Sequence, residues 1–170
     1  MDLVISMRAR GLNIPNVDPF DGGVSARALF LLETPGPRAV GTGFVSRDNP
    51  DPSAKNIGTA LDDAAFLRSE IVLWNVVPHC VSTVDKNRNV TSAQIRDAMP
   101  DTQAFVDCLS NLKVIVLCGR RAQKVAPLLQ LPSGVELLST FHPGARSYSR
   151  QKYREHIHMT FRKTHRLLLA

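Results

Sequence analysis

Residues 27–37 read RALFLLETPGP, and this stretch decides the fold class. Its apolar run is shorter than a typical helix and ends abruptly at Glu33 and the Pro-Gly turn that follows. Short continuous apolar runs between turn signals are typical of strands that are buried on both faces of a sheet. The stretch therefore predicts a buried strand over residues 27–32, of the kind found in parallel sheets.

Three further apolar runs repeat this pattern along the chain: residues 71–77 (IVLWNVV), 113–118 (KVIVLC) and 135–140 (VELLST). The segments around them predict helices: one capped by Ser53 or Asn56, one that begins at a Thr91–Gln94 capping box and is interrupted near Pro100, one over residues 120–130 and one over residues 148–169. Strands that alternate with helices in this way predict an α/β fold, a three-layer α/β/α sandwich with a central four-stranded parallel sheet.

The rest of the chain is expected to connect these elements. It predicts a short helix over residues 3–11 and loops over residues 12–25, 38–53 and 79–90, where glycine, proline and polar residues gather. A length of 170 residues is enough for one full hydrophobic core, and no internal repeat divides it. We therefore expect a single domain over residues 1–170.

The composition is that of a globular protein without special covalent chemistry. Hydrophobic residues make up 44% and charged residues 21%, which excludes a disordered chain. No apolar stretch approaches the about 18 residues of a membrane span, and the N-terminus lacks a signal-peptide pattern, so we expect a cytoplasmic protein. Three widely spaced cysteines, Cys80, Cys108 and Cys118, argue against a disulfide framework and a four-cysteine metal site. They predict buried, reduced thiols.

The charge favours a polyanionic partner, with nucleic acid foremost. The formal net charge is +6 and the pI is about 9.7. Much of the excess lies near the C-terminus, where Glu155 is the one acid among seven cations: Arg146, Arg150, Lys152, Arg154, Arg162, Lys163 and Arg166. This segment is either a solvated basic helix face or a surface that contacts phosphates.

Polar residues follow three of the predicted strands. Glu33 follows the first, Asn75 interrupts the second and His142 follows the fourth. Since ligands bind beyond the carboxyl ends of parallel strands, these side chains could share one site. Each also has a structural alternative: Glu33 as a solvated acid in a turn, Asn75 as an amide that ties down the next loop, and His142 as a ring bonded to a backbone carbonyl.

Four motifs in this order resemble the uracil-DNA glycosylase superfamily, in particular its branch with a Glu-Ala-Pro-Gly type motif. They are Glu33-Thr34-Pro35-Gly36, the glycine-rich segment Gly41-Thr42-Gly43-Phe44-Val45, the strand-end Asn75, and His142-Pro143-Gly144. The resemblance extends from about residue 27 to the C-terminal helix. It implies a repair enzyme that hydrolyses the N-glycosidic bond of uracil, or of another deaminated base, after that base is flipped out of DNA.

The resemblance also implies a role for each position. Glu33 would position water or stabilise the cationic sugar, and His142 would donate to the departing base. Base-binding residues would be Thr34, Pro35, Gly36, Phe44 and Asn75, with Phe44 stacking on the ring and Asn75 reading its polar edge. Residues that contact DNA would be Pro143, Gly144, Ala145, Arg146, Tyr148 and Arg150.

Three features depart from the related branch. Its four cluster-binding cysteines are not matched, so we expect no iron–sulfur cluster and no other cofactor. Leu32 stands where the family usually has glycine, and Gly144 where it has serine. The alternative to an enzyme is therefore a catalytically silent member of the fold that binds nucleic acid. An enzyme of small phosphorylated ligands is less favoured, because no phosphate-binding glycine loop follows a strand. We expect a monomer that acts on DNA, with no membrane partner.

Overall fold

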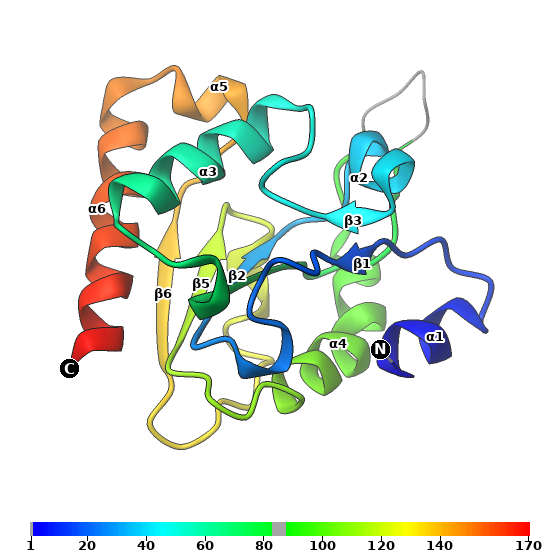
Figure 1. Cartoon of the computed structure of the whole chain (residues 1–170). Helices are drawn as coiled ribbons and strands as arrows, with labels where there is room; N and C mark the ends of the chain where they lie inside the picture. The colour runs from blue at the N-terminus through cyan, green and yellow to red at the C-terminus, as the bar shows by residue number, and fades with distance from the viewer. Residues whose placement is uncertain (1, 83–87) are drawn as a thin grey trace.

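The computed structural model describes residues 2–82 and 88–170, and its centre is a four-stranded parallel sheet (Figure 1). The strands are β2 (Ala28–Leu32), β4 (Ile71–Asn75), β5 (Val114–Cys118) and β6 (Glu136–Thr140). They lie in the order β4-β2-β5-β6, and every neighbouring pair is parallel. The predicted sheet is therefore confirmed, with all four strands at the expected places.

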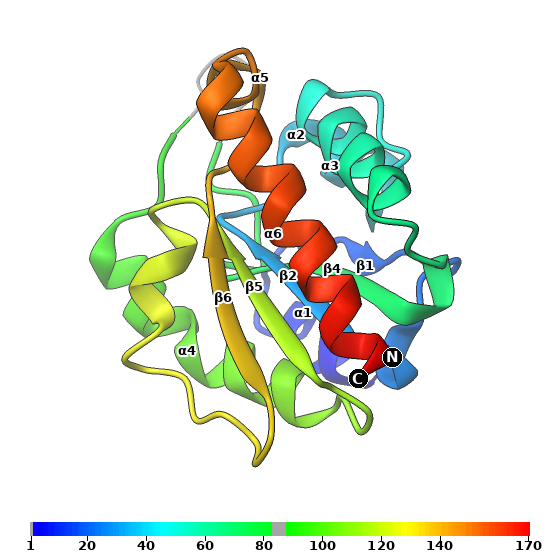
Figure 2. The same cartoon turned by 90° about the vertical axis from the view of Figure 1, so that its left-hand side faces the viewer.

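Helices cover both faces of this sheet, which makes three layers (Figure 2). The helices α3 (Pro52–Asp63) and α6 (Gln151–Leu169) lie on one side, and α4 (Ser92–Asp107) lies on the other with α1 (Asp2–Arg8) beside it. Phe30 of β2 packs on Phe161 of α6, with ring centroids 4.6 Å apart. Trp74 of β4 stacks on Phe105 of α4 at 4.5 Å. Burial of these aromatic rings on opposite faces stabilises the sandwich.

The segments predicted as loops contain small elements that the sequence analysis missed. The predicted loop over residues 38–53 contains most of α2 (Pro37–Thr42) and all of β3 (Phe44–Val45), and β3 pairs in parallel with β1 (Asn16–Val17). A proline at the first helical position and Gly43 at φ +81° explain where α2 begins and ends. Asp51, rather than Ser53 or Asn56, caps α3, because its carboxylate accepts from the N–H groups of Ser53 and Ala54.

The predicted helices are also corrected in detail. The capping box of Thr91 and Gln94 is confirmed, but α4 continues through Pro100 because buried residues on both sides of the proline hold it against the sheet. Residues 120–130 form only the short 3-10 helix η3 (Ala122–Val125). The C-terminal helix is divided into α5 (Ala145–Tyr148) and α6. Two further 3-10 turns are η1 (Gly23–Ser25) and η2 (Arg68–Glu70).

A charge cluster with two buried carboxylates, Asp18 and Asp21, joins the N-terminal loops to the sheet. The Arg68 guanidinium donates to the carboxylates of Asp18 at 2.6 Å, Asp21 at 2.8 Å and Asp48 at 2.6 Å. Burial raises the pKa of the Asp21 carboxyl to about 7, against the opposing charge of Arg68. The cluster therefore fixes the loop after β3, which carries Asp48, to the start of β4.

Candidate active site

The first two motif segments lie side by side beyond the carboxyl ends of β2 and β4. Pairing of the two chains continues past the strands: the Val76 N–H donates to the Leu32 carbonyl at 2.9 Å, and the Val77 N–H donates to the Glu33 carbonyl at 3.0 Å. The Thr34 hydroxyl then donates to the His79 carbonyl at 2.6 Å. These bonds hold the Glu33 and Asn75 segments in a fixed relative position.

Glu33 is half-buried and anchored, so it is not the solvated turn acid that one sequence alternative described. Its Oε1 accepts a hydrogen bond of 2.8 Å from the Val90 N–H, just before α4 begins. Nothing in the sequence pointed to Val90 as this partner. One carboxylate oxygen therefore holds the backbone, and the other has no hydrogen-bond partner within residues 2–82 and 88–170.

The surroundings of His142 favour its neutral imidazole form with the proton on Nε2. Burial lowers its pKa below the usual 6.5, although the negative charges of Glu33 and Asp51 act in the opposite direction. The Gly144 N–H donates to Nδ1 at 2.9 Å, so Nδ1 must be unprotonated. We assign the proton to Nε2 from this bond. The ring thus bonds a backbone N–H through Nδ1, not the backbone carbonyl of the structural alternative, and Nε2 remains as its N–H donor.

Two neighbours fix the His142 loop, and the sequence analysis did not include either of them in the site. The Asn56 amide of α3 donates to the Pro143 carbonyl at 2.7 Å. Gly119, directly after β5, has φ +99°, and a Cβ there would come within 2.8 Å of the His142 Cβ. Only glycine combines this backbone conformation with such a close approach. The sequence signal that could have identified Gly119 was its place directly after a buried strand.

Asn75 presents an amide in a nearly closed environment. It is the last residue of β4, lies opposite Leu32 and is 3% exposed. In the part of the chain that the structure describes, no residue forms a hydrogen bond with its side chain. Its amide atoms are not among the fully enclosed side-chain atoms that lack a partner in the described part of the chain. An amide that no described residue occupies is available to read the polar edge of a ligand, as a ligand-reading role requires.

The remaining predicted base-binding residues surround α2. Pro35 is buried, Gly36 caps the helix, and Phe44 on β3 keeps 36% of its surface exposed. The Phe44 carbonyl accepts from the Asn49 amide at 2.9 Å, and Asn49 is buried. The backbone at Phe44 is therefore fixed while part of its ring surface remains open.

The predicted DNA-contacting residues form two groups. Ala145, Arg146 and Arg150 are exposed in and after α5, and Gly144 caps that helix. Tyr148 instead is half-buried, and its hydroxyl lies 2.6 Å from His158 Nε2. His158 Nδ1 in turn lies 2.9 Å from the Asp63 carboxylate. Tyr148 therefore ties α5 to α3 and α6, a packing role that the sequence did not reveal.

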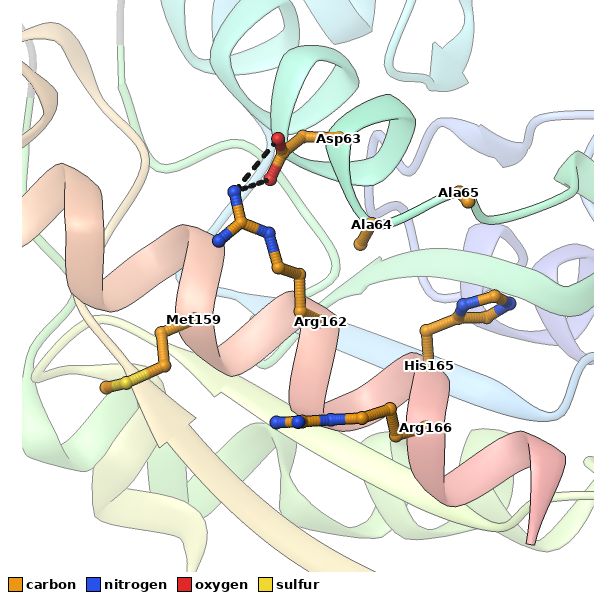
Figure 3. A pocket seen from close by; sticks show the side chains of 7 residues that line it. All are labelled: Asp63, Ala64, Ala65, Met159, Arg162, His165 and Arg166. Carbon is orange, nitrogen blue, oxygen red and sulfur yellow. Dashed lines mark hydrogen bonds and ion pairs between the residues drawn. The ribbon is translucent and has the colours of Figure 1, made fainter.

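A separate hollow of about 400 Å³ lies between α3 and α6, away from the strand-end residues (Figure 3). None of the predicted site residues lines it. Its lining is Asp63, Ala64, Ala65, Met159, Arg162, His165 and Arg166. The Arg162 guanidinium pairs with the Asp63 carboxylate at 2.7 Å, so this part of the basic segment is internally neutralised.

The cysteines are free thiols, and they differ in exposure. Cys118 is buried, which raises its pKa to about 12, Cys80 is half-buried, and Cys108 is exposed, so the expectation of burial is wrong for Cys108. Across residues 2–82 and 88–170 no group of three or more metal-binding side chains is found. No helix among the described residues is both long and apolar enough to cross a membrane.

The state of His142 makes stability depend on pH. Because its folded pKa lies below 6.5, the unfolded chain binds this proton more tightly, and stability falls as the pH decreases below that value. We expect wild type to lose more unfolding free energy than His142→Gln between about pH 8 and about pH 5. Urea unfolding of both proteins measures this, and parallel profiles would contradict the assignment.

The fold and its strand-end residues define an α/β protein with a polar site at the carboxyl edge of a parallel sheet. A family model of the uracil DNA glycosylase superfamily matches residues 19–165. The chain belongs to this superfamily, as the four motifs implied.

Three solved structures match the chain at low sequence identity, and the first of them shares the fold. A solution structure of a candidate uracil DNA glycosylase from Methanosarcina acetivorans is 16% identical, with a TM-score of 0.54 over 89% of this chain and 98% of that one. The UNG of Nitratifractor salsuginis is 14% identical (TM-score 0.44; 84% and 74% covered). A mimivirus UNG in complex with UGI is 16% identical (TM-score 0.47; 85% and 63%). No curated protein sequence matches the chain.

Proposed function

We propose that the protein is a DNA N-glycosylase, which hydrolyses the N-glycosidic bond of uracil or another deaminated base flipped out of DNA. The observation that carries this proposal is the enclosed His142 ring, whose Nδ1 accepts from the Gly144 N–H and leaves Nε2 to donate, at the same carboxyl edge of the sheet as the buried Asn75. Membership of the superfamily supports the reaction class. A flipped base would enter between these groups.

The leaving base explains why a neutral imidazole is useful. Cleavage of the glycosidic bond leaves negative charge on the base, and a fixed N–H donor stabilises that charge without a proton transfer. An imidazolium would be a stronger acid, but burial disfavours that form at this position. His142 therefore acts as an electrostatic donor to a carbonyl oxygen of the base.

Asn75 supplies recognition. Its carboxamide offers one acceptor and two donors, which suits a ring edge with an N–H beside a carbonyl, as in uracil. Phe44 would stack on the ring, with the backbone of Thr34, Pro35 and Gly36 shaping the pocket. The exposed residues Ala145 and Arg146, which follow Gly144, would enter the duplex, with Arg150 close to the phosphates. Pro143 is buried and bonded to Asn56, so it would hold this loop in place, as Tyr148 holds α5.

Glu33 would act on the sugar side of the bond. Its free carboxylate oxygen can orient water or stabilise the positive charge that develops on the sugar, while the other oxygen keeps its bond to Val90. Its charge also opposes the effect of burial on the pKa of His142. Negative charge develops on the base and positive charge on the sugar. His142 would stabilise the first, and Glu33 the second.

Glu33→Gln separates these roles, because glutamine keeps an acceptor for the Val90 N–H and removes the charge. We expect single-turnover cleavage to slow by at least about tenfold, or 1.4 kcal/mol, with unfolding free energy within about 1 kcal/mol of wild type. Glu33→Ala, the comparison variant, loses the Val90 bond as well and should also be less stable in urea. Full activity in Glu33→Gln would show that the carboxylate does not take part.

The proposal is tested with a uracil-containing oligonucleotide that is incubated with the protein and then treated with alkali, which breaks the strand at abasic sites. Strand breaks in the uracil strand, and none in a thymine-containing control, are the expected result.

A catalytically silent DNA-binding protein is the second candidate. The engagement of the Glu33 carboxylate with the Val90 backbone favours it, because a carboxylate that serves the backbone need not serve catalysis. Binding that weakens with salt, without abasic sites in strands carrying uracil, hypoxanthine or xanthine, would establish this candidate instead.

A further inference from the structure

Strand β6 is the last strand in the order β4-β2-β5-β6, so it forms an open edge of the sheet. The Glu136 N–H donates to the Lys113 carbonyl, and the Thr140 carbonyl accepts from the Gly119 N–H, so residues 136, 138 and 140 face β5. The backbone N–H and C=O groups of Leu137 and Ser139 consequently point away from the sheet. No strand in the described part of the chain pairs with them. They form a short template for one more strand.

A groove of about 320 Å³ runs beside this edge, between β6 and α6. Its apolar part includes Leu138 and Met159, and Met159 is 57% exposed. The other lining residues are Ser139, His156, Thr160, Lys163 and Arg166. Figure 3 shows the neighbouring side of α6, where the Arg166 side chain runs along the helix towards Met159.

The groove carries positive charge that no acidic side chain among residues 2–82 and 88–170 neutralises. Arg162, on the far side of α6, pairs with Asp63, whereas Lys163 and Arg166 have no ion-pair partner within residues 2–82 and 88–170. Glu136 is the one acid on β6, and it forms no ion pair with either cation in that part of the chain. The groove therefore combines apolar surface with backbone donors and acceptors, and with two cations, that have no partner among the described residues.

We propose that this groove docks an extended acidic segment of a partner protein, which adds to β6 as a fifth strand. The peptide backbone would pair with Leu137 and Ser139, an apolar side chain would rest on Leu138 and Met159, and a carboxylate would meet Lys163 or Arg166. Backbone pairing supplies affinity in such strand addition, and the side chains supply selectivity.

The alternatives fit these features less well. A nucleic-acid backbone offers phosphate acceptors, which would meet the outward carbonyls of Leu137 and Ser139 as well as their N–H groups. A second copy of the chain, paired edge to edge, would bring two sets of Lys163 and Arg166 towards each other. An acidic peptide satisfies both donors and acceptors, and it complements the charge.

The test uses a fluorescein-labelled eight-residue peptide of alternating glutamate and valine, and a version in which alternate backbone amides are N-methylated. We expect the first to bind and the second to bind at least tenfold more weakly, because methylation blocks strand pairing. Lys163→Glu should weaken binding of the unmethylated peptide at least tenfold. In ¹⁵N-labelled protein, the amide signals of Leu137 and Ser139 should shift on peptide addition. Equal binding of the two peptides would overturn the proposal.

Two matched variants complete the design. Ser139→Pro removes an outward N–H, is compatible with an edge strand, and should weaken binding without lowering the melting temperature. Arg96→Glu makes the same charge change as Lys163→Glu, but at an exposed position of α4 on the other face of the sheet. It should leave the affinity for the peptide unchanged. Equal loss in Lys163→Glu and Arg96→Glu would show long-range charge attraction only.

Two further results would replace the proposed occupant. If a uracil-free oligonucleotide displaces the peptide, as judged from the amide signals of Leu137 and Ser139, the groove is a nucleic-acid site. Self-association that Ser139→Pro abolishes would make it a contact between copies. Base release is expected to be the same in Ser139→Pro as in wild type, so the docking site and the glycosylase proposal can fail separately.

Discussion

His142→Ala is expected to slow base release by about 10²–10³-fold in kcat, equivalent to about 2.7–4 kcal/mol of transition-state stabilisation. The variant removes the Nε2–H donor at the place where negative charge develops on the leaving base. It leaves Gly119 and Gly144, which shape the loop, unchanged. The KM should change little, since this donor acts mainly in the transition state. Single-turnover and steady-state cleavage of a uracil-containing oligonucleotide measure both quantities.

His165→Ala is the matched control for this loss. His165 is also half-buried and lies on α6, where its ring packs on Phe66, away from the strand-end residues (Figure 3). It should keep wild-type kcat even if it lowers stability. A similar decrease in both variants would mean that the effect comes from folding, and full activity of His142→Ala would remove the imidazole from the mechanism.

Asn75→Ala is expected to reduce kcat/KM by about 30–150-fold, equivalent to the loss of about 2–3 kcal/mol from two hydrogen bonds to the base. Its unfolding free energy should stay within about 1 kcal/mol of wild type, because the variant removes a buried amide without a described partner. A structural asparagine predicts the opposite pattern, with lower stability and little change in specificity. Cleavage kinetics and urea unfolding together distinguish the two roles.

Asn111→Ala provides the control for Asn75. Asn111 is exposed in the turn before β5, at the end of the sheet opposite to the site. Both its activity and its stability should match wild type. If Asn75→Ala unfolds at clearly lower urea than Asn111→Ala, the amide has a structural partner and its assignment to base recognition is wrong.

The sheet could be predicted from the sequence because its signal is local. Each strand is a continuous apolar run that ends at a turn, and burial on both faces requires such runs. Glu33, Asn75 and His142 were found as polar exceptions at the ends of these runs. Parallel pairing then places them at one edge without further information.

The features that could not be predicted from the sequence depend on contacts between residues far apart in the chain. The bond from the Val90 N–H to Glu33 and that from Asn56 to Pro143 join segments 57 and 87 positions apart. The tautomer of His142 depends on a backbone N–H two residues on, and its pKa depends on burial. The strand β3 forms through pairing with β1 across the chain, which outweighs the loop-like composition of both segments.

The protonation state and place of His142 give a mechanism only if the protein releases a base. The most direct measurement is mass-spectrometric detection of the free base after the protein is incubated with a uracil-containing oligonucleotide. We predict free uracil in an amount equal to the abasic sites formed, and none from a matched thymine strand. Salt-sensitive DNA binding with no free base from uracil, hypoxanthine or xanthine strands would contradict the glycosylase assignment.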